Sequence, residues 1–154
     1  MRRRTIATIF AVTVGAEALL FMAEPRIGAA QPASDNRQQV MLPAMGRDMV
    51  LTEMRGMLAA VGDILRALAA NDSAAAAKAA RASGMAKAAD GEREIKRRLP
   101  PPFLQLAMKT HATFDTIADA LDASAPRDQV LGKMADLTAN CVACHAAYRF
   151  ESSR

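Results

Sequence analysis

Two cysteines and a histidine near the C-terminal end are the residues best suited to do chemistry. The run Cys141-Val142-Ala143-Cys144-His145 contains the only two cysteines of the 154 residues. Two thiols at this spacing can add across the two vinyl groups of a haem, and the imidazole that follows can reach its iron. On a helix, positions i, i+3 and i+4 project from one face, so all three side chains would meet one flat ligand. The motif predicts one covalently bound haem c.

Three other uses of these residues are weaker alternatives. A structural zinc ion needs four ligands, and His111 is the only other histidine or cysteine in the sequence. A thioredoxin-like pair is expected at the start of a helix that follows a strand, whereas the pattern before Cys141 is helical. A disulfide between Cys141 and Cys144 on one continuous helix would require distortion of the backbone.

The first thirty residues have the features of an export signal. Residues 1–4 are Met-Arg-Arg-Arg, residues 6–16 are apolar, and residues 28–30 are Gly-Ala-Ala. We expect cleavage after Ala30 and a periplasmic location, which agrees with haem attachment, because bacteria attach c-type haem outside the cytoplasmic membrane. Glu17 interrupts the apolar character, so an uncleaved anchor in contact with the membrane is the alternative.

The charge balance argues against a nucleic-acid partner. The whole chain has 20 Lys and Arg against 16 Asp and Glu. Removing residues 1–30 takes away four basic and two acidic residues, which leaves 16 and 14, a net charge of +2. No dense basic face interleaved with aromatic residues remains, so no nucleic-acid binding is predicted.

Residues 31–154 are predicted to form one all-α domain. Alanine is abundant, and no run of β-branched residues alternates with polar ones. Proline, glycine and capping residues divide the chain into four expected helices. These are Pro43–Ala70, a second from Asp72 or Ser73 that bends at Gly84 or ends between Ala89 and Arg98, Pro102–Leu121 and Pro126–Phe150.

Apolar residues three and four positions apart predict the buried face of each helix. On the last helix the series is Val130, Met134, Leu137, Cys141, Cys144 and Tyr148. The expected stripe of the first helix is Met54, Met57, Leu58, Val61, Leu65 and Leu68, and that of the third is Leu106, His111, Phe114, Ile117 and Leu121. The haem would therefore lie inside a helical bundle near one end.

This layout resembles the class II c-type cytochromes, the cytochrome c′ family and its Met-ligated low-spin relatives. Tyr148 and Arg149 match the aromatic and basic residues that commonly follow the haem histidine in that family. The resemblance implies an antiparallel four-helix bundle, with Cys141 and Cys144 as thioether attachment points and His145 as the proximal iron ligand. It also implies that Tyr148 and Arg149 lie beside the haem, and that two copies can pair through the first two helices.

The residue on the other side of the iron distinguishes two functions. In the family, a methionine of the first helix gives a sixth ligand, whereas a bulky apolar residue leaves the iron five-coordinate. Counting back from the end of this helix near Ala70 indicates Met54. Arg37, four residues before Met41, resembles the family's Arg-x-x-x-Met opening and indicates Met41 instead, and Met57 is a further alternative.

These side chains also have simpler interpretations. Methionine is a flexible core filler, so its helical spacing alone does not identify a ligand. Met41, Met45 and Met49, at i, i+4 and i+8, would form a soft helical face for Cu(I). His111 is an alternative sixth ligand, although a lone histidine near a core is more often a packed, hydrogen-bonded residue.

The sequence thus predicts a periplasmic cytochrome that carries single electrons between redox partner proteins and is not an enzyme. The alternative is a five-coordinate protein that binds nitric oxide or carbon monoxide. A basic cluster at the end of the second helix either complements the partial charge of the helix end or docks an acidic redox partner. It consists of Arg93, Lys96, Arg97 and Arg98.

Overall fold

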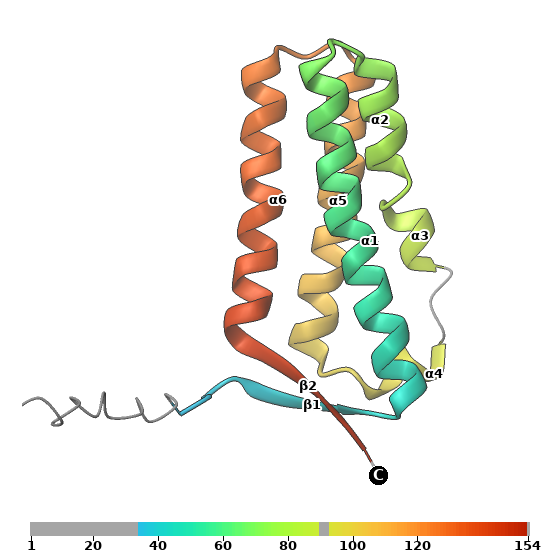
Figure 1. Cartoon of the computed structure of the whole chain (residues 1–154), viewed down its shortest axis with the longest axis vertical. Coiled ribbons are helices and arrows are strands. Elements are labelled where there is room, and N and C mark those ends of the chain that lie inside the picture. The colour runs from blue at the N-terminus through green and yellow to red at the C-terminus, as the bar shows by residue number, and fades with distance from the viewer. Residues whose placement is uncertain (1–33, 90–92, 154) are drawn as a thin grey trace, which may run out of the picture. The chain divides into compact units, whose positions relative to one another are not determined.

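The computed structural model describes residues 34–89 and 93–153, so the expectations for residues 1–30 lie outside it. The described chain is mostly helical, as predicted, and begins and ends in a short strand (Figure 1). Its elements are β1 (Gln38–Leu42), α1 (Ala44–Ala69), α2 (Ser73–Arg81), α3 (Met85–Ala89), α4 (Arg93–Arg98), α5 (Pro101–Asp122), α6 (Arg127–Ala147) and β2 (Tyr148–Ser152). Among these helices, none has the length and hydropathy that a membrane span requires.

Proline starts the three long helices. Pro43, Pro100 and Pro126 precede α1, α5 and α6 in an extended conformation that suits the residue before a first helical turn. Asn71 adopts a left-handed conformation with φ of 59° after α1, and the Asp72 side chain then accepts a hydrogen bond from the Ala75 backbone N at 2.9 Å. These local signals explain why α1 and α5 lie within one residue of their predicted bounds.

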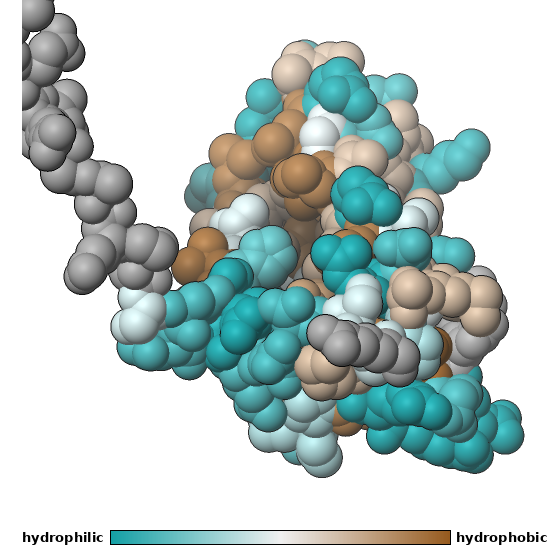
Figure 2. Space-filling model, turned by 60° about the horizontal axis from the view of Figure 1, so that its bottom comes forward, coloured by the Kyte–Doolittle hydropathy of each residue, from teal (hydrophilic) through white to brown (hydrophobic). Residues whose placement is uncertain are grey.

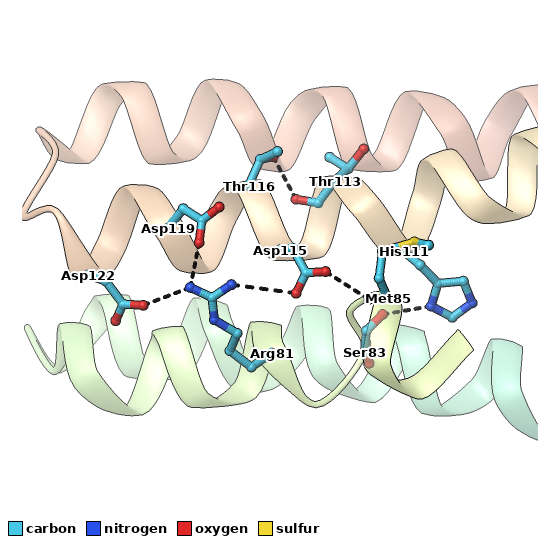
Figure 3. A network of polar contacts seen from close by, with 9 residues as sticks. All are labelled: Arg81, Ser83, Met85, His111, Thr113, Asp115, Thr116, Asp119 and Asp122. Carbon is cyan, nitrogen blue, oxygen red and sulfur yellow. Dashed lines mark hydrogen bonds and ion pairs between the residues drawn. The ribbon is translucent and has the colours of Figure 1, made fainter. Parts of the chain in front are cut away.

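The predicted second helix is divided into α2, α3 and α4. Gly84 lies at the first interruption, where a Cβ atom would collide with the carboxylate of Asp115 on α5. Asp115 accepts a hydrogen bond from the Met85 backbone N at 2.8 Å, and the Arg81 side chain forms ion pairs along the same side of α5 (Figure 3). The hydrogen bonds that Arg81 donates to Asp122 and Asp119 raise the pKa of Arg81. Close approach to α5 thus explains the glycine at the bend.

The main core draws residues from α1, α2, α5 and α6. Its largest fully buried side chains include Ile64, Phe114, Ile117, Val130 and Leu137. Small residues on α2 pack into the same core and allow a close approach to α1 and α5. They are Ala76, Ala77 and Ala80.

Two predicted core positions on α1 are wrong. Leu58 is 72% exposed and Leu65 is 45% exposed, whereas Ala60 and Ile64 are buried. The buried face of α1 is therefore rotated from the stripe that the large apolar residues suggested. The reason is that α1 packs against α2, a helix of small residues, and the hydropathy of α1 alone does not mark which of its faces such a partner covers.

Truncation of Phe114 is expected to weaken the main core strongly. Its ring is 1% exposed, so Phe114→Ala should lower the free energy of unfolding by about 3–5 kcal/mol. Leu58→Ala, at an exposed position of α1, should change it by no more than about 0.5 kcal/mol. Urea unfolding followed by circular dichroism measures both values, and equal effects would contradict the core described above.

A two-stranded parallel sheet at the ends of the described chain corrects the prediction that strands are absent. β1 pairs with β2 in a register that runs from Gln38 opposite Tyr148 to Leu42 opposite Ser152. The last helix consequently ends at Ala147, not at Phe150.

A second, smaller core holds this sheet in place. Val40 and Leu42 of β1 are buried together with Ile95 of α4. From α5, the Phe103 ring meets the rings of Tyr148 and Phe150 edge-on, at centroid distances of 5.2 and 5.5 Å. Aromatic edge-to-face pairs of this kind add to the stabilisation from burial. The second core therefore fixes β2 directly after the Cys-x-x-Cys-His run.

Candidate functional site

A cavity of about 330 Å³ lies where α1, α5, α6 and the two-stranded sheet meet. Its size falls within the range of small-molecule sites, about 300–1,000 Å³. Apolar residues are exposed around a recess on the face shown in Figure 2. The cavity is lined by Arg37, Arg47, Leu51, Met54, Phe103, Cys144, His145, Tyr148, Arg149 and Phe150.

The last two turns of α6 carry the predicted haem-attachment residues. Cys144 and His145 line the cavity, and Cys141 lies one turn earlier, with its Sγ 3.5 Å from the carbonyl oxygen of Leu137. Both cysteines are free thiols and partly buried, whereas His145 is exposed. The two thiols and the imidazole are thus carried by consecutive turns of one helix, as the motif predicts.

Partial burial keeps the two cysteines in the thiol form. Loss of hydration raises the pKa of Cys141 and of Cys144, and for Cys144 the neighbouring Cys141 adds to the rise. Both side chains are therefore protonated at neutral pH. Addition of S–H across a vinyl group consumes the sulfur and its proton together, so the protonated form already has the atoms that thioether formation needs.

Of the three candidate methionines, only Met54 lines this cavity. Met54 is partly buried on α1, and Met57, one turn further along, packs against the main core. Met41 lies on β1, where it is 48% exposed and alternates with the buried Val40 and Leu42. The structure therefore brings Met54 to Cys144 and His145, and places the other two elsewhere.

The prediction that Met41, Met45 and Met49 form one helical face for Cu(I) is wrong. Met45 and Met49 lie on α1, but Met41 belongs to β1. The proline that starts α1 separates Met41 from the other two, so the i, i+4 and i+8 spacing does not describe one helix.

His111 is a buried, hydrogen-bonded residue of α5 and is not among the residues that line the cavity. Its Nδ1 lies 2.8 Å from the carbonyl oxygen of Ser83, which only accepts, so Nδ1 carries the hydrogen. Its Nε2 lies 3.5 Å from Oε1 of Glu53. His111 thus connects α5 to the bend after α2 through Ser83 (Figure 3), and to α1 through Glu53.

Tyr148 and Arg149, which the resemblance places beside the haem, line the cavity from strand β2 and not from the predicted helix. The Arg149 Nη1 lies 2.5 Å from Oε1 of Glu151. A second arginine, Arg37, donates from Nη1 to the carbonyl oxygen of His145 at 3.4 Å. The segment before β1 thus contacts the end of α6 directly.

Sequence reasoning missed five residues of the cavity, one of which is Arg37. Phe103 and Phe150 form part of its apolar wall, and Arg47 and Leu51 line it from α1. Arg47, Leu51 and Met54 stand at i, i+4 and i+7, which is the spacing of one helical face. That spacing was a usable signal for the two residues on α1.

The set of side chains around the cavity fits a haem. It combines the Cys144 thiol, an imidazole nitrogen, a thioether sulfur, aromatic walls and three guanidinium groups that suit the two carboxylates of a haem. The second thiol, that of Cys141, lies one turn earlier on α6 and does not line the cavity. Within residues 34–89 and 93–153, the cavity included, no group of three or more His, Cys, Asp and Glu side chains is placed to hold a metal ion by itself.

No protein-family model matches the sequence, and comparisons with curated proteins and with solved structures gave no match. The assignment of a function therefore depends on the side chains of the cavity.

Proposed function

We propose that residues 31–154 are a periplasmic c-type cytochrome that carries single electrons between protein partners through one covalent haem. The observation that carries the proposal is that Met54 of α1 and the consecutive Cys144 and His145 of α6 line the same cavity. In this proposal α1, α2, α5 and α6 form the four-helix bundle that holds the haem. The proposal agrees with the resemblance of the sequence to class II c-type cytochromes.

Each group of residues has a defined role in holding the haem. Cys141 and Cys144 would hold the haem through two thioether bonds, and His145 would hold its iron through an imidazole nitrogen. Arg37, Arg47 and Arg149 supply positive charge near the haem carboxylates, where charge-assisted hydrogen bonds are stronger than neutral ones. The rings of Phe103, Tyr148 and Phe150 exclude water from one wall of the cavity.

Met54 makes the proposed protein an electron carrier. When bound, haem supplies an iron that changes between the ferric and ferrous states. His145 and Met54 would both hold the iron, which would leave no position on it for a substrate. A thioether ligand favours the ferrous state and raises the reduction potential, and the apolar walls act in the same direction because they disfavour the additional charge of the ferric state.

Covalent haem and its spin state test the proposal. The full chain is exported in a bacterium that performs c-type haem attachment, and the product is stained for haem after denaturing electrophoresis. We expect a stained band of the size of the protein and a low-spin absorption spectrum that carbon monoxide does not change.

Two other outcomes would contradict the electron carrier. A high-spin spectrum that shifts with carbon monoxide would support the five-coordinate protein that binds nitric oxide or carbon monoxide. Absence of haem from the denatured band would reject a c-type cytochrome of either kind.

A further inference from the structure

Charge is distributed unevenly along the fold. We call the half that contains the cavity the cavity half; it comprises the described residues 36–55, 82–89, 93–111 and 138–153, which include the start of α1 and the end of α6 (Figure 1). The opposite half, here the hairpin half, comprises residues 56–81 and 112–137. In the hairpin half, the α1–α2 and α5–α6 turns are joined by a hydrogen bond from Arg127 to Asn71.

The two halves have opposite net charges. The described residues of the cavity half contain ten Lys and Arg and four Asp and Glu, a net charge of +6. Adding the two acidic residues of the undescribed segment 90–92 would leave +4. The hairpin half contains five Lys and Arg and seven Asp, a net charge of −2. The small net charge of the whole domain therefore conceals a charge separation along the helices.

Helix α4 is the most basic element of the cavity half. Its six residues include Arg93, Lys96, Arg97 and Arg98 and a single acid, Glu94. Glu94 pairs with Arg97 and Arg98 at 3.5 and 3.2 Å, so the helix keeps a net charge of +3 after this pairing. All three arginines are exposed.

Packing fixes α4 against β1, whose partner strand β2 lines the cavity. Ile95 is buried against Val40 and Leu42 of β1, and it approaches Gly46 so closely that a Cβ atom there would collide with it. β1 in turn pairs with β2, which contributes Tyr148 and Arg149 to the cavity. The exposed arginines of α4 thus have a defined position relative to the cavity, and they are not a freely moving tail.

The surface suits an acidic protein better than an anionic membrane. A membrane-surface helix buries an apolar face between lipid headgroups, but the only large apolar side chain of α4, Ile95, faces the protein interior. The surface around the end of the molecule that faces forward in Figure 2 is largely hydrophilic. A surface of this kind recognises carboxylates on another protein through charge, which increases the rate of encounter and orients the partner.

We propose that the cavity half, with Arg93, Arg97 and Arg98 of α4 as its most basic part, docks an acidic redox protein so that the partner meets the haem-bearing end. This inference rests on the proposed function for its electron-transfer role. The opposite charge of the hairpin half disfavours docking in the reverse orientation.

Two double variants with the same change in net charge test this orientation. Arg93→Glu with Arg97→Glu alters the cavity half, and Lys78→Glu with Lys133→Glu alters the hairpin half. The first readout is nuclear magnetic resonance of the ¹⁵N-labelled protein during titration with poly-L-glutamate. The second readout is the rate at which hexacyanoferrate(III), a small anion, oxidises the reduced haem protein at low and high ionic strength.

In the wild type we expect poly-L-glutamate to shift amide signals of the cavity half, and oxidation to slow as salt is added. Arg93→Glu with Arg97→Glu should remove these shifts and slow oxidation by about tenfold at low salt, the lower limit for electrostatic steering. The hairpin variant should retain both properties. At high salt all three proteins should react at similar rates.

Equal effects of the two double variants would overturn the proposal, because only net charge would then matter. Shifts with vesicles of phosphatidylglycerol but not with poly-L-glutamate would also overturn it, in favour of a membrane surface. A protein without haem would refute the proposed function alone, since the titration with poly-L-glutamate does not depend on electron transfer.

Discussion

Replacing both Cys141 and Cys144 with Ser is expected to abolish covalent attachment of haem completely. A serine hydroxyl is a much weaker nucleophile than a thiol and cannot form a thioether, although the two side chains are similar in size. The measurement is haem staining after denaturing electrophoresis of the exported protein, in which the wild type should give a strong band and the double variant none. Each single variant should retain a weaker band, because one thioether bond remains possible.

The two residues between the cysteines provide the matched control. Val142 and Ala143 are exposed on the same turn of α6, so Val142→Ser with Ala143→Ser introduces two hydroxyls without removing sulfur. This variant should stain like the wild type. If the Cys141→Ser, Cys144→Ser protein still carried haem through denaturation, the thiols would not be the attachment points and the proposed function would be wrong.

The second large effect is expected for Met54→Ala. Met54 is the one candidate methionine that lines the cavity, so its removal should leave the iron with His145 alone as a protein ligand. The low-spin spectrum should become high-spin, carbon monoxide should bind, and the reduction potential should fall because the thioether no longer favours the ferrous state. Absorption spectroscopy and redox titration measure these changes.

Variants of two other methionines distinguish the loss of an iron ligand from the loss of packing. Met57→Ala removes a side chain of similar burial one turn away, where it packs against the main core. Met41→Ala removes the exposed methionine of β1. Both variants should keep the wild-type spectrum, and Met57→Ala should affect mainly the stability. A low-spin spectrum that survives Met54→Ala and is lost in one of the others would identify that residue as the ligand.

The long helices were predictable because their signals are local. Pro43 and Pro100 mark where α1 and α5 begin, and Asn71 and Asp72 mark the turn after α1, all within a few residues of the boundary. Gly84 also indicated a bend correctly, since the chain there lies against Asp115. By contrast, hydropathy misplaced Leu58 and Leu65, because the partner of α1 is a helix of small residues whose position depends on the whole fold.

The sheet was not predictable from local patterns. Tyr148 continues the helical series of α6 by falling four residues after Cys144, and this spacing extended the predicted helix too far. Its strand conformation depends on pairing with Gln38, which is 110 positions away in the sequence. Strand preference depends strongly on such neighbours, so a five-residue segment without its partner carries little information.

The candidate site was likewise predictable from the sequence only in part. Cys141, Cys144 and His145 form a contiguous motif that the sequence displays directly. Met54 was one of several methionines until the fold placed it on the cavity, and Phe103 reaches the site only through its contacts with Tyr148 and Phe150.

The pairing of β1 with β2 also has a consequence for the order of assembly. The two strands are the first and last regular elements of the described chain, so during synthesis their contact forms only after α6 has been made. Closing so long a loop costs more chain entropy than forming the helical hairpins, and we therefore expect the helices to pack first. Until the strands meet, one wall of the cavity is missing. A haem would then reach the thiols of α6 from the side that β2 later covers, and pairing of β2 with β1 would complete the cavity wall.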